Sequence, residues 1–140
     1  MWRPRERRHV RARRIRELAR VGTCGLTHIA LAVRDPARSA AFYSAVFGCV
    51  ETWRSDGWIE VTTPGCQDII SFRSDLPNPG KSAGIVHFGF RLRAPGEIDG
   101  AVEAVKRAGG RIKERGEFSP GHPYAFFEDP DGYEVEVWFE

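Results

Sequence analysis

Two segments that lie far apart in the chain share one alternating pattern of apolar and polar residues. In residues 27–33 and 85–92 every second residue is apolar, which predicts strands with one face packed under a helix. The apolar rows are Ile29, Leu31 and Val33 in the first segment and Val86, Phe88, Phe90 and Leu92 in the second. The pattern therefore sends His28 and His87 to the opposite face of each strand, beside small residues.

The chain repeats itself at this spacing. His28 and His87 are separated by 59 residues, as are Pro36 and Pro95. Each strand is followed by a segment with helical periodicity. Asp35 is placed to cap the first helix and Gly48 to end it, and the second helix is expected over residues 96–108.

Short strands complete each half. They are predicted at residues 49–55, 58–62 and 67–73 in the first half, and at 111–114, 124–128 and 133–140 in the second. The sequence thus predicts an α+β fold of two tandem βαβββ modules, residues 26–73 and 85–140, joined by a turn-rich linker at 74–84. Together they would form a curved mixed sheet with a concave cleft for a metal or ligand.

Composition adds the size and the charge distribution. The 140 residues are 41% hydrophobic, enough for one core or two half-sized modules. Residues 1–25 carry a net charge of +7, whereas the rest carries −5. Three interpretations of this basic extension stay open: a disordered or weakly helical tail, a start codon placed too far upstream, or a tether to nucleic acid or an anionic membrane. Nucleic-acid binding is expected only through this extension.

Localisation follows from what the chain does not contain. Cys24, Cys49 and Cys66 have neither disulfide-framework nor zinc-finger spacing, and no apolar stretch reaches the roughly 18 residues of a membrane span. We therefore expect a soluble cytoplasmic protein that keeps its thiols reduced and does not enter a membrane.

Three polar side chains are the candidate metal ligands. His28 and His87 occupy equivalent strand positions, and the last strand buries Val135, Val137 and Phe139, which leaves Glu136 on the histidine face. Two imidazoles and one carboxylate suit Fe²⁺, Mn²⁺, Ni²⁺ or Zn²⁺. The alternative is that each histidine is a structural strand residue.

The segments HIALAVRDPARSAAFYSAVFG, HFGFRL and FFEDPDGYEVEV, within residues 26–140, resemble the vicinal oxygen chelate superfamily. This superfamily includes glyoxalases, extradiol dioxygenases and bleomycin resistance proteins. The resemblance implies metal ligands at His28, His87 and Glu136, and a fourth ligand position at Ser71, where serine is a weak ligand. Phe126 stands where dioxygenases have a tyrosine, so Tyr124 and His122 are the candidate catalytic acid or base.

The resemblance implies a metal-dependent enzyme, either a lactoylglutathione lyase-like lyase or isomerase or a dioxygenase. Its substrate would be a small molecule with two adjacent oxygens, and the protein would be a homodimer. The site would lie within one chain or across the dimer. The alternative is a metal-free protein that binds a drug or metabolite.

Overall fold

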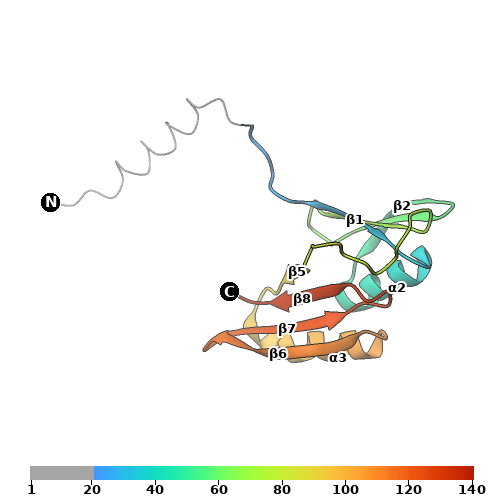
Figure 1. Cartoon of the computed structure of the whole chain (residues 1–140). Helices are drawn as coiled ribbons and strands as arrows, with labels where there is room; N and C mark the ends of the chain where they lie inside the picture. Colours follow the sequence, from blue (N-terminus) through green and yellow to red (C-terminus); the bar gives the residue numbers. More distant parts are fainter. Residues whose placement is uncertain (1–20) are drawn as a thin grey trace.

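The structure is a computed structural model that describes residues 21–140. Most of the arginine-rich extension, residues 1–20, lies outside the described residues, and so do the expectations attached to it. Residues 21–26 are exposed and lead away from the first strand (Figure 1). Within residues 21–140, no helix is both long and apolar enough to cross a membrane.

Within residues 21–140, eight strands form two separate four-stranded mixed sheets, which confirms the α+β class and the two βαβββ modules (Figure 1). Sheet A has the order β1-β4-β3-β2 and sheet B the order β5-β8-β7-β6, so the second module repeats the topology of the first. Sheet A comprises β1 (His28–Ala32), β2 (Val50–Ser55), β3 (Trp58–Thr62) and β4 (Ile69–Arg73). Sheet B comprises β5 (Phe88–Arg91), β6 (Arg111–Ser119), β7 (His122–Glu128) and β8 (Glu134–Trp138).

The helices begin and end close to the predicted residues. Helix α2 spans Pro36–Phe47; the Asp35 carboxylate accepts hydrogen bonds from two backbone N–H groups of its first turn, and Gly48 ends it at φ 70°. A left-handed terminus of this kind favours glycine. Helix α3 spans Ile98–Arg107 and follows a 3₁₀ turn, η1 (Pro95–Glu97), so it begins two residues later than predicted.

Within the described part of the chain the two modules share one core, because α2 packs against both sheets. Tyr43 on α2 is fully buried, and its ring centroid lies 5.3 Å from that of Phe72 in sheet A and 6.1 Å from that of Phe90 in sheet B. Phe42 on the same helix lies 6.0 Å from Phe127 in sheet B. The position of each sheet is therefore set by contacts with the same helix.

The β7–β8 turn makes a second connection between the modules. The Asp131 side chain is fully buried and accepts hydrogen bonds from the Arg34 backbone N–H at 2.9 Å, the Arg38 guanidinium at 3.1 Å and the Ser39 hydroxyl at 3.2 Å. The Tyr133 hydroxyl donates to the Ala32 carbonyl at 2.7 Å. This turn of the second module is thus anchored on β1 and α2 of the first.

Strands β6 and β5 differ most from the predicted ranges. Strand β6 continues to Ser119 instead of ending at residue 114, because an edge strand can carry charged side chains on both faces without losing its pairing. Strand β5 begins at Phe88 instead of residue 85, and Val86, predicted to be buried, is 74% exposed. His122, predicted to lie in a loop, begins β7.

Candidate metal and substrate site

His87 and Glu136 meet on the face of sheet B that carries no helix. His87 directly precedes β5, and Glu136 lies on the adjacent strand β8, where it pairs with Gly89. His87 Nε2 is 3.3 Å from Glu136 Oε2, and the Glu136 side chain is only 13% exposed. The small Gly89 leaves space for this contact, because a Cβ there would lie 3.3 Å from the Glu136 Cβ.

Module 1 has a different arrangement at the equivalent positions. His28 begins β1 and is exposed, and Ser71 pairs with Ala30 just as Glu136 pairs with Gly89. The Trp58 indole N–H donates a 2.7 Å hydrogen bond to the Ser71 hydroxyl. Ser71 is therefore buried and engaged by a neighbouring side chain.

The three predicted ligands are distributed over both sheets. His87 and Glu136 are in contact on sheet B, whereas His28 lies on sheet A. Within residues 21–140 of one chain, no three side chains of the His, Cys, Asp and Glu types come together as a metal-binding group. The structure thus brings two of the three predicted ligands together.

The two candidate catalytic residues lie on β7, on the same face as Glu136. The Tyr124 hydroxyl donates to Glu114 on β6 at 2.7 Å, and this hydrogen bond raises the pKa of Tyr124 because ionisation would place two negative charges side by side. His122 Nδ1 lies 2.5 Å from the Ser119 hydroxyl. Neither side chain is hydrogen bonded to the His87–Glu136 pair.

Phe126 lies between these residues and the pair. Its ring centroid is 5.0 Å from that of His87 and 5.5 Å from that of Tyr124. The ring thus supplies one apolar wall to the His87–Glu136 pair. The strand register accounts for this position, since Phe126 on β7 pairs directly with Glu136 on β8.

The family model of the Glyoxalase/Bleomycin resistance protein/Dioxygenase superfamily matches residues 25–137. The chain belongs to this superfamily. The match covers both modules, including all three predicted ligands. No curated protein matches the chain in sequence.

Solved structures of the superfamily share the fold. A glyoxalase-related enzyme from Fulvimarina pelagi is 23% identical with a TM-score of 0.68, and the alignment covers 84% of this chain and 89% of that one. A lactoylglutathione lyase from Agrobacterium tumefaciens is 21% identical with a TM-score of 0.65, covering 85% and 96%. A superfamily enzyme from Burkholderia phytofirmans is 22% identical with a TM-score of 0.67, covering 81% and 96%.

Two contacts of this superfamily member were not predicted from its sequence. Glu114 binds the Tyr124 hydroxyl, and Trp58 binds Ser71. Both depend on the register between neighbouring strands, and β6 has a bulge between Ile112 and Glu114 that changes the alternation. The sequence offered one signal, since Trp58 is the first residue of the strand predicted at 58–62.

Proposed function

We propose that this protein is a divalent-metal-dependent enzyme that acts on a small molecule with adjacent oxygens, with lyase, isomerase or dioxygenase chemistry. The observation that carries the proposal is the contact between His87 Nε2 and Glu136 Oε2 at 3.3 Å, with His28 at the equivalent place in the other module. An imidazole and a carboxylate with little exposure are donors that Fe²⁺, Mn²⁺, Ni²⁺ and Zn²⁺ accept.

The residues fit such an ion in part. His87 and Glu136 would hold it on sheet B, and His28 would complete the set, either from the same chain or from a second copy in a homodimer. When bound, the ion would act as a Lewis acid toward the two substrate oxygens. Ser71 contributes no ligand in this proposal, because its hydroxyl already accepts the hydrogen bond from Trp58.

The surrounding side chains have separate roles in this proposal. Phe126 limits the access of water to the His87–Glu136 pair from the β7 side. Tyr124 stays protonated because of its hydrogen bond to Glu114, and would hold or donate a proton at its hydroxyl oxygen. His122, whose Nδ1 is at Ser119, presents Nε2 as the nitrogen that would exchange a proton.

A second candidate function is metal-free binding of a drug or metabolite. The contact between Trp58 and Ser71 favours it, because it closes the fourth ligand position of the superfamily's metal-binding members with an aromatic side chain. This candidate predicts ligand binding that a strong chelator leaves unchanged.

Metal analysis tests the proposal. The protein, purified without chelators and supplemented with iron, manganese, nickel and zinc in turn, should retain one ion per site, and Glu136→Gln should lose it because a neutral amide is a weaker ligand. Glu134→Gln is the matched control, since Glu134 lies on the same strand but pairs with Lys113 at 2.8 Å. Equal, trace metal content in all three proteins would favour the metal-free function.

A further inference from the structure

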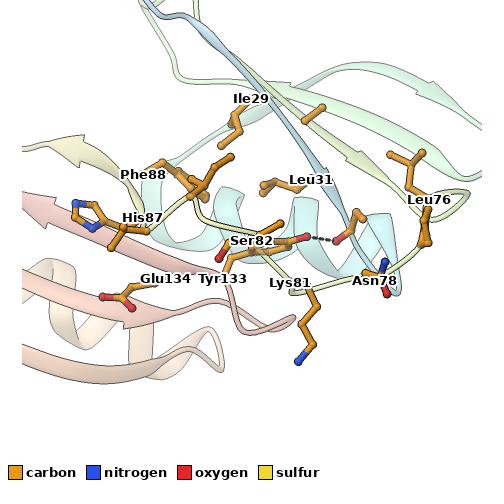
Figure 2. Close-up of a pocket in the computed structure, with 16 residues that line it drawn as sticks. Ile29, Leu31, Leu76, Asn78, Lys81, Ser82, His87, Phe88, Tyr133 and Glu134 are labelled. Carbon is orange, nitrogen blue, oxygen red and sulfur yellow. Dashed lines mark hydrogen bonds between the residues drawn. The ribbon is translucent and has the colours of Figure 1, made fainter.

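A crevice of about 450 Å³ lies between the modules, beside His87 (Figure 2). One wall is β1, the other is the inter-module segment 76–88, and Tyr133 and Glu134 border it at the start of β8. Most of its lining is apolar, with Ile29, Leu31, Ile85 and Phe88 among the larger side chains. Its size falls in the range of small-molecule pockets.

The charged groups at the crevice do not face its interior. The Lys81 ammonium group points away from it (Figure 2), and the Glu134 carboxylate pairs with Lys113 at 2.8 Å. The Tyr133 hydroxyl donates to the Ala32 carbonyl across the crevice. A charged group placed inside would lose part of its hydration without gaining a partner from these lining residues.

Apolar side chains at the crevice are exposed to a degree that needs explanation. Leu76 is 38%, Ile85 61% and Val86 74% exposed, and all three lie on the segment that forms one wall. Exposed apolar residues that gather at one concave place are typical of a ligand site. The same segment includes His87, which also borders the crevice and contacts Glu136 at 3.3 Å.

We propose that the crevice binds an uncharged apolar arm of the substrate, such as an alkyl or aryl group, while the oxygen-bearing end faces His87 and Glu136. The location of the oxygen-bearing end rests on the function proposed above; the binding of the arm does not. The crevice selects against substrates whose arm is charged, because that charge would be buried without a partner.

A series of straight-chain alcohols tests the arm alone. Butan-1-ol, hexan-1-ol and octan-1-ol are titrated into the full chain in the presence of EDTA and followed by amide chemical shifts. Affinity should rise by about fourfold for each methylene that the crevice buries. Shifts should concentrate at residues 29–32 and 82–88. An affinity that does not depend on chain length, or shifts elsewhere, would overturn the proposal.

Two variants locate the binding. Ser82→Phe adds a large side chain in the lining and should weaken octan-1-ol binding at least tenfold, whereas Ser55→Phe, on the distant edge strand β2, should leave it unchanged. Ile85→Ser removes an exposed apolar wall residue and should weaken binding several-fold without unfolding the chain. Suppose that octan-1-ol binding is unchanged in both crevice variants and that both variants shift in sedimentation toward monomer. The crevice residues would then contact a second copy of the chain, and the proposal would be overturned.

The outcome is separable from that of the proposed function. Alcohol binding in EDTA together with the absence of bound metal would support the crevice and contradict the metal-dependent enzyme. Stoichiometric metal without length-dependent alcohol binding would support the metal-dependent enzyme and contradict the binding of an apolar arm in the crevice.

Discussion

At the scale of single residues, several polar groups are buried together with partners that determine their protonation. Asp129 accepts a 2.9 Å hydrogen bond from the Tyr43 hydroxyl and two more from backbone N–H groups of its own turn. Burial raises the pKa of Asp129, and these hydrogen bonds oppose the rise because they stabilise the charged carboxylate. Burial also raises the pKa of Tyr43, so its hydroxyl remains a donor.

Tyr43→Phe should therefore destabilise the protein in a pH-dependent way. The hydrogen bond stabilises the charged form of Asp129, so its contribution is complete above the Asp129 pKa and disappears as the pH falls through it. We expect a loss of about 1–2 kcal/mol in the free energy of unfolding at pH 7 and a smaller loss at pH 4. Urea denaturation at both pH values measures it, and a loss that is larger at pH 4 would contradict this assignment.

At the scale of elements, the β7–β8 turn connects the modules through Asp131. Its buried carboxylate is shared by the Arg34 backbone, the Arg38 guanidinium and the Ser39 hydroxyl. The guanidinium is about half exposed, so water weakens its attraction. The half-exposed guanidinium can also hydrogen bond to water. The Arg34 backbone N–H and the buried Ser39 hydroxyl depend on the Asp131 carboxylate as their acceptor.

Asp131→Ala should remove these bonds and leave the Ser39 hydroxyl buried without this partner. The expected loss in the free energy of unfolding is about 3 kcal/mol, measured by urea denaturation. Asp75→Ala is the matched control, since Asp75 forms an exposed ion pair with Arg73, and its midpoint should not change. A similar midpoint for both variants would show that the turn does not connect the modules energetically.

The elements themselves were predictable from sequence where local chemistry determines them. Asp35 and Gly48 mark the ends of α2 because capping and left-handed termini need particular residues. The extent of β6 was not predictable from its charged residues, because pairing with β7 rather than hydrophobic alternation makes it a strand. Alternation also predicted the contact face of Glu136 correctly, but not that Trp58 would engage Ser71, which depends on how neighbouring strands align.

At the scale of the whole molecule, the duplicated module places one histidine on each sheet. The sequence repeat indicated that His28 and His87 are equivalent, and their positions at the start of β1 and just before β5 agree with this. The distance between the sheets is a property of the packing around α2 and of any second copy, which the repeat does not encode. We nevertheless propose that His28, His87 and Glu136 bind one ion.

X-ray absorption spectroscopy of the zinc-loaded protein tests that claim most directly, because it counts imidazole ligands. We expect two imidazole nitrogens at about 2.0–2.1 Å from each zinc, together with oxygen ligands. His28→Ala should reduce the count to one, whether His28 comes from the same chain or from a second copy. A wild-type spectrum with one imidazole or none would contradict the claim.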